Sequence, residues 1–177
     1  MADGIGPRTA ASAEPPIARP SVRWPRLFHR VVLRFARLPV AKKVLVVEAS
    51  IWLALARIAL LVVPFRHLAE RFGSVANPQA VPSPSSLSEP QEAMARDVSW
   101  AVTRAARYVP FRAVCLPQAI AAKAMLDRRE VASTMHFGVK KPDGGAALMA
   151  HAWLDAGMIE VTGYPIEAGF VEVVRFV

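Results

Sequence analysis

The sequence has a single cysteine, Cys115, among its 177 residues. One cysteine excludes an internal disulfide framework and fits a protein that folds in a reducing compartment. The first 22 residues also lack the apolar core of a secretory signal peptide. We therefore expect a cytoplasmic protein rather than a secreted one that disulfides stabilise.

Long uncharged apolar runs are missing too. The most apolar segment extends from Pro39 to about Val63, but Glu48 and Arg57 interrupt it, so no stretch of 18 residues is free of charge. A charge at the centre of a bilayer costs about 2.5–3.5 kcal/mol on insertion scales. We expect a buried helix with a charged edge here, and peripheral contact with a membrane stays open as an alternative.

Signatures of metal, nucleotide and nucleic-acid binding are absent as well. The chain has no Walker-type or dinucleotide-binding glycine loop, and one cysteine with four scattered histidines does not make a metal site. The net charge is +8, but the basic residues lack the interleaved aromatic residues of a nucleic-acid site. We predict no cofactor, no metal and no nucleic-acid partner.

Changes in composition along the chain divide it into four parts. Arginines recur at helical spacing between Trp24 and Arg37, which suits an anionic membrane surface, an acidic partner or an ordinary docked helix. The tail before them is rich in alanine and proline, and we expect it to be disordered. The predicted parts are a disordered tail at 1–22, a helical region at 23–73, a Pro- and Ser-rich loop at 74–90 and a core at 91–177.

The core changes from helical to strand periodicity along its length. Ser88 is the predicted N-cap of a helix that ends before Pro110, and a second helix begins at Cys115. After Arg129 apolar residues alternate with others, as in strands with one apolar face. Helices followed by antiparallel strands predict an α+β domain. The predicted strands are 131–139, 147–155, 158–162 and 170–177, with turns at Lys140 to Gly145 and at Ala156-Gly157.

Cys115 stands at a predicted helix N-terminus, where Leu116 and Ile120 recur at helical spacing and Pro117 is tolerated. The partial positive charge of a helix start favours a thiolate. His151 lies in a predicted strand further along the chain, so the pair suggests a thiol nucleophile and its base. An inert buried cysteine is the simpler alternative.

The stretch from Cys115 to Gly163 resembles the transglutaminase-like leader peptidases of lasso-peptide biosynthesis, the B2 proteins, which are related to the microcin J25 processing protein. The resemblance lies in Cys-Leu-x-Gln-x-x-Ala from Cys115 and Ala-His-Ala-Trp around His151, and it extends over about residues 25–177. It implies a transglutaminase-like or papain-like cysteine peptidase core behind an apolar helical region. The implied function is removal of the leader from a ribosomally made precursor before macrocyclisation.

Residues near the predicted pair receive supporting roles. Gln118 is three residues into the Cys115 helix, where it supports an oxyanion or hydrogen-bonds the preceding loop. Trp153 shares a strand face with His151, so it covers the histidine, lines a peptide groove or belongs to the core. His136 is a rival base without the Ala-His-Ala-Trp context, and we interpret it as structural or as a surface residue.

The group that orients the histidine is where the sequence departs from the resemblance. Relatives usually carry an aspartate about a dozen residues after the histidine, where this chain has Gly163. With a turn at Ala156-Gly157, His151 would face Thr162, and Glu160 would lie diagonally. We expect a Cys–His dyad whose histidine is oriented by Thr162, Glu160 or a backbone carbonyl.

The resemblance also implies partners. These are the precursor peptide, a separate leader-recognition B1 protein and a lasso cyclase, because the chain has no additional recognition module. Two alternatives remain open: a transglutaminase-like acyl transferase with the same two residues, and a non-catalytic, membrane-associated scaffold, which the missing aspartate favours.

Overall fold

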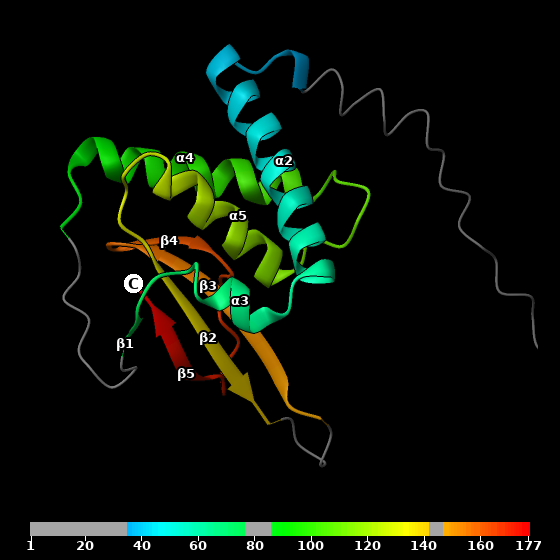
Figure 1. Cartoon of the computed structure of the whole chain (residues 1–177). Coiled ribbons are helices and arrows are strands. Elements are labelled where there is room, and N and C mark those ends of the chain that lie inside the picture. The colour runs from blue at the N-terminus through cyan, green and yellow to red at the C-terminus, as the bar shows by residue number, and fades with distance from the viewer. Residues whose placement is uncertain (1–34, 77–85, 142–146) are drawn as a thin grey trace, which may run out of the picture. The chain divides into compact units, whose positions relative to one another are not determined.

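The structure is a computed structural model that describes residues 35–76, 86–141 and 147–177. The chain divides into Met1–Arg37 and a compact unit, Leu38–Val177. In that unit, helices pack on an antiparallel sheet (Figure 1). The predicted α+β class is confirmed.

Several predictions fall outside the described residues. They are the tail at 1–22, nearly all of the basic stretch from Trp24 to Arg37, the middle of the Pro- and Ser-rich loop, and most of the turn from Lys140 to Gly145.

The helices begin where local signals predict. α4 (Glu89–Ala106) starts with a capping box, in which the Ser88 side chain accepts from the Gln91 backbone N–H and the Gln91 side chain accepts from the Ser88 backbone N–H. Pro90 lies in the first turn. α5 (Cys115–Asp127) begins at the cysteine. Pro39 precedes α2 (Val40–Val62), which leads into the short α3 (Phe65–Ala69). The predicted starts of these helices are confirmed.

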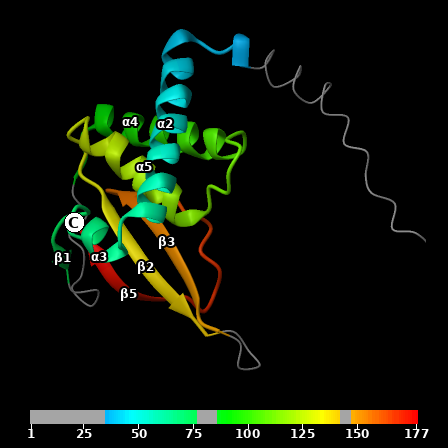
Figure 2. The ribbon, with the colours of Figure 1, turned by 45° about the vertical axis from the view of Figure 1, so that its right-hand side comes forward.

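α2 forms an outer layer of the unit. It packs on α4 and α5, whereas α5 packs on the strands (Figure 2). Its inner face buries Leu53 and Ala49 completely, and Glu48 at its edge pairs with Arg129 after α5, 2.6 Å between Oε2 and Nη2. The prediction that this helix is buried is therefore wrong for its opposite face. α2 lies outside α4 and α5, so that face has no neighbour among the described residues.

The sheet has the strand order β1-β5-β2-β3-β4, with antiparallel pairing throughout the described residues. Sequence periodicity missed β1, a two-residue strand inside the predicted loop, since two residues carry no period. The strands are β1 (Val75–Ala76), β2 (Thr134–Lys140), β3 (Met149–Ala156), β4 (Ile159–Thr162) and β5 (Val171–Phe176).

The two faces of the sheet differ in character. Met135 and Leu154 pair across β2 and β3 and are fully buried, as are Met125 and Leu126 of α5. This apolar face is the one the helices cover. The alternate residues of the same strands carry histidine, tryptophan and carboxylate side chains on the other face, and the candidate site begins there.

Candidate active site

Cys115 is the first residue of α5 and is partly exposed. An α-helix offers no backbone acceptor to its first N–H groups, so those of Cys115 and Leu116 are available as donors at this end. Gln118 Nε2 donates to the carbonyl oxygen of Ala113 at 2.6 Å. The Gln118 side chain therefore holds the loop that leads into the cysteine.

The direction of α5 brings its first turn to the end of the sheet where β3 begins. A short connection joins the end of α5 to the start of β2, and Thr134 at that start pairs with Asp155 near the end of β3. α5 thus runs antiparallel to β2 and in the same sense as β3, along which it packs (Figure 1). Cys115 and His151 consequently lie toward the same end of these elements. α5 packs on the apolar face, whereas His151 belongs to the alternate residues of β3.

His151 sits beside an open strand edge. β4 pairs only with the last three residues of β3, so on that side His151 has no paired strand residue in the described part of the chain. No hydrogen bond joins Cys115 to His151 within the described residues. Catalytic hydrogen bonds are often long before substrate binds, and His151 is partly exposed.

The His151 ring is held by a backbone carbonyl. Nε2 lies 2.7 Å from the carbonyl oxygen of Gly163, and because a carbonyl only accepts, Nε2 must carry the hydrogen. Nδ1 is then the ring nitrogen able to accept a proton. Ring contacts with Trp153, 6.0 Å between centroids, and with Phe170, 5.4 Å, fix the ring plane.

The predicted pairing of β3 with β4 is wrong. The turn is Gly157-Met158, one residue later than expected, and Asp155 pairs with Glu160. Gly157 has a φ of 57°, the left-handed value that a type II′ turn places at its first central residue. The pairing then shifts so that Thr162 pairs with Leu154.

This register removes two predicted partners of His151. Glu160 lies opposite Asp155, which is four residues beyond the histidine along β3. The Thr162 hydroxyl is buried without a hydrogen-bond partner among the described residues. The sequence left three groups open as the partner that orients His151. In the structure the partner is a backbone carbonyl, that of Gly163.

Gly163 stands twelve residues after His151, where the resemblance implies an aspartate, and its backbone excludes a side chain. Its φ is 87°, and a Cβ there would lie 2.6 Å from the carbonyl oxygen of Ala152 and 2.7 Å from Trp153 Cβ. Only glycine fits this close approach. The carbonyl of this residue supplies the acceptor that the absent carboxylate would otherwise provide.

Trp153 is 7% exposed, which leaves too little surface for the predicted role in a substrate groove. Its indole stacks on His136 at 5.3 Å and 2°, and also on His151. Gly138 makes room for it, because a Cβ there would lie 2.9 Å from the indole. Of the roles considered for Trp153, the structure supports two: it belongs to the buried core, and it covers one side of the His151 ring.

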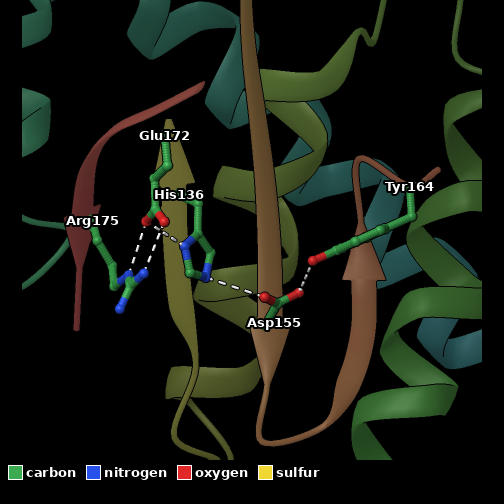
Figure 3. Close-up of polar contacts among 5 residues, drawn as sticks. All are labelled: His136, Asp155, Tyr164, Glu172 and Arg175. Atoms are coloured by element: carbon green, nitrogen blue, oxygen red, sulfur yellow. Dashed lines mark hydrogen bonds and ion pairs between the residues drawn. The ribbon is translucent and has the colours of Figure 1, made fainter. Parts of the chain in front are cut away.

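A polar cluster, which sequence reasoning missed, lies beside this stack on the same face (Figure 3). His136 Nδ1 lies 2.7 Å from Glu172 Oε1, and its Nε2 lies 3.1 Å from Asp155 Oδ2. The second contact has ion-pair distance but not the angle of a good hydrogen bond. Arg175 binds both oxygens of Glu172 at 2.8 Å, and the Tyr164 hydroxyl donates to Asp155 Oδ1 at 2.5 Å.

The cluster balances its charges. Burial alone would lower the pKa of His136, but the contacts with Asp155 and Glu172 outweigh it and raise that pKa. Burial would raise the pKa of Glu172, but Arg175 and His136 lower it. Burial and then Asp155 raise the pKa of Tyr164. His136 is therefore a buried structural residue whose pKa the two carboxylates raise, rather than a surface residue. The sequence signal that could have shown this is its position in the strand alternation, on the same face as Trp153.

The described residues contain no group of three or more histidine, cysteine, aspartate or glutamate side chains that could hold a metal ion. One described helix, α2, is long and apolar enough to cross a membrane by length and composition alone.

Comparison with known families gives one match. The family described as the transglutaminase-like superfamily matches residues 59–175, which include α3, α4, α5 and nearly all of the sheet. No curated protein and no solved structure shows a significant match.

Proposed function

Because the chain belongs to the transglutaminase-like superfamily, we propose that it is a cysteine peptidase that removes the leader from a lasso-peptide precursor before macrocyclisation. Membership points to cysteine peptidase or acyltransferase chemistry. The observation that carries the proposal is the His151–Gly163 hydrogen bond, which leaves Nδ1 as a base at the end of the sheet where α5 starts with Cys115. The leader specificity rests on the Cys-Leu-x-Gln and Ala-His-Ala-Trp strings.

The chemistry follows from these positions. His151 Nδ1 takes the proton of the Cys115 thiol as the sulfur attacks the carbonyl carbon of the scissile peptide bond. Backbone N–H groups at the start of α5 stabilise the oxyanion. The C–N bond breaks as His151 returns the proton to the leaving amine. Water then attacks the thioester, releases the new carboxylate and regenerates the thiol.

The proposed partners are the precursor peptide, a separate leader-recognition protein and a lasso cyclase. All three come from the resemblance to B2 proteins. An acyl transferase would form the same thioester and pass the acyl group to an amine instead of water, so only the products separate the two activities.

The test is to incubate the purified full-length protein with a lasso precursor and its leader-binding protein, and to identify products by mass spectrometry. Hydrolysis yields leader and core fragments whose masses together exceed the precursor by one water. Acyl transfer yields a leader fragment joined to an added amine. Cleavage supports the proposal, whereas an amine adduct alone favours the acyl transferase.

The matched variants are Cys115→Ala and His151→Ala, with His67→Ala as a control on a half-exposed histidine of α3. We expect both site variants to lose product formation and the control to retain it. Alkylation of Cys115 by iodoacetamide at neutral pH should also slow in His151→Ala. Product formation that persists in Cys115→Ala would refute the mechanism and favour the scaffold alternative.

A further inference from the structure

The outer face of α2 is an apolar stripe along the whole helix. Its members are between 48 and 74% exposed, and no charged residue lies among them. Monomeric proteins seldom expose an apolar patch of this extent unless it binds something. The stripe consists of Val40, Val44, Val47, Ile51, Leu55, Ile58 and Val62.

The stripe is straight. Along the 23 residues of α2 it advances 22 positions in six steps, about 3.7 residues per step, close to the helical repeat of 3.6. A left-handed coiled coil with a second copy requires steps averaging about 3.5 residues. A straight stripe roughly 33 Å long at 1.5 Å per residue suits a flat, laterally continuous surface better than a supercoiled partner.

The sequence that leads into the stripe is basic. From Pro15 to Val47 the sequence has no aspartate or glutamate and has eight basic residues. Clusters of this size on or next to an amphipathic helix bind anionic lipid headgroups. The basic residues are Arg19, Arg23, Arg26, Arg30, Arg34, Arg37, Lys42 and Lys43.

The charged residues beside the stripe are also consistent with a negatively charged binding surface. Lys43 and Arg57 lie along one side of it by helical spacing. The carboxylate on the other side, Glu48, is paired with Arg129 at 2.6 Å and lies 3.9 Å from Arg128. Because that carboxylate is neutralised, nothing among these flanking groups repels a negatively charged surface.

We infer that the outer face of α2 rests on the surface of an anionic phospholipid membrane. α2 lies in the plane of the interface, with the stripe among the upper acyl chains and with Lys43 and Arg57 at the headgroups. It does not span the bilayer, because its inner face stays packed on α4 and α5. The Glu48–Arg129 and Lys42–Asp97 ion pairs hold it there.

The test is flotation of the full-length protein with vesicles of phosphatidylcholine, with or without phosphatidylglycerol. We expect the protein to float with the vesicles that contain phosphatidylglycerol, and added salt to weaken this binding. The double variant Ile51→Glu with Ile58→Glu should lower the vesicle affinity at least about tenfold. Both residues are more than half exposed, so folding should survive, and circular dichroism checks it.

A matched control adds the same charge elsewhere. Met158→Glu with Val75→Glu changes two residues that are even more exposed, in the β3–β4 turn and in β1, and should leave binding unchanged. The inference is overturned if the wild type does not float, or if both double variants bind equally. It is also overturned if light scattering shows a dimer that only the α2 variant dissociates. None of these outcomes depends on peptidase activity.

Discussion

Two histidines on one face of the sheet, His136 and His151, stack on the same tryptophan but have opposite partners. His151 Nε2 meets one neutral carbonyl at 2.7 Å. His136 has a carboxylate oxygen near each ring nitrogen, at 2.7 and 3.1 Å. A carbonyl sets the tautomer and leaves Nδ1 to move a proton, whereas two carboxylates hold a ring in its charged form.

The difference teaches that a shared face and a shared ring contact do not decide what a histidine does. The charge of its partners does. In this chain a charged cluster lies next to a proposed proton-transfer group, with Trp153 between the rings. Substitutions at and near the two histidines should therefore affect different properties, the cleavage rate for His151 and the stability for His136.

The largest effect should come from His151→Gln. Removing the proposed base should lower the rate of precursor cleavage by about 1,000-fold or more, while the melting temperature changes little. His136→Gln should keep the rate within about tenfold of wild type at temperatures where it is folded. Equal losses of rate in the two folded variants would contradict the division of roles.

His136→Ala should show the reverse pattern, with a large loss of stability. It removes the ring that Asp155 pairs with and leaves Glu172 with Arg175 alone, which should lower the free energy of unfolding by about 3 kcal/mol. Urea denaturation measures it. The control His67→Ala, in a half-exposed side chain, should stay within about 0.5 kcal/mol, and a similar small change in His136→Ala would mean that the cluster does not stabilise the fold.

Gly163→Ala tests the carbonyl that holds His151. The new Cβ meets the Ala152 carbonyl, so we expect a loss of about 2 kcal/mol in stability and a clear loss of rate. Gly169→Ala is matched in backbone, with a φ of 94°, but its Cβ would meet only the flexible Lys140 side chain. A comparable loss of rate in both variants would show that backbone strain, rather than the carbonyl position, matters.

Tyr164→Phe tests the same carbonyl through the residue that follows Gly163. It removes the hydrogen bond to Asp155 one residue after Gly163, at a cost of about 1.5 kcal/mol for a bond to a charged group. The cleavage rate should fall less than in Gly163→Ala. Tyr108→Phe, in a half-exposed tyrosine, is the control, and an unchanged rate in Tyr164→Phe would mean that Asp155 does not help to position the loop.

The smallest effect is a pH slope that belongs to the cluster. Because the folded pKa of His136 is raised above 6.5, its stabilisation is complete below that pH and is lost as the pH rises through the folded pKa. Because the folded pKa of Glu172 is lowered below 4.5, its stabilisation is present above that pH and is lost as the pH falls through the folded pKa.

Together these shifts place the greatest contribution of the cluster between pH 4.5 and 6.5. The slope on the alkaline side is at most about 1.4 kcal/mol per pH unit for one group. Thermal melts from pH 4.5 to well above pH 6.5 should show a flatter alkaline side in His136→Gln than in the wild type. Identical slopes would assign the pH dependence to other groups.

Local signals predicted much of the fold correctly. The capping pair Ser88 and Gln91 stands within one turn of α4, and Cys115 begins α5 directly after its loop. Each signal involves residues that are neighbours in the chain, so the sequence alone contains the whole interaction. Alternation likewise predicted the apolar face of β2 and β3, since a strand exposes its faces with a period of two.

The partners of His151 were harder to predict because they depend on register. One turn residue, Gly157, takes a left-handed conformation, and the pairing shifts again between Leu154 and Asp155. Each such shift moves side chains to new neighbours. Thr162 and Glu160 were therefore plausible partners in one register and are not partners in the other.

The α+β class, the helix starts, the alternating strands and the candidate pair Cys115 and His151 could all be predicted before the fold was known, because they depend on short-range periodicity, composition and short motifs. The Gly163 carbonyl as the partner of His151, the cluster around His136 and the exposed face of α2 could be found only in the folded chain. His136 and Glu172 are 36 residues apart, and α2 is exposed because it lies outside α4 and α5. Contacts of that range arise from packing, which no local pattern encodes.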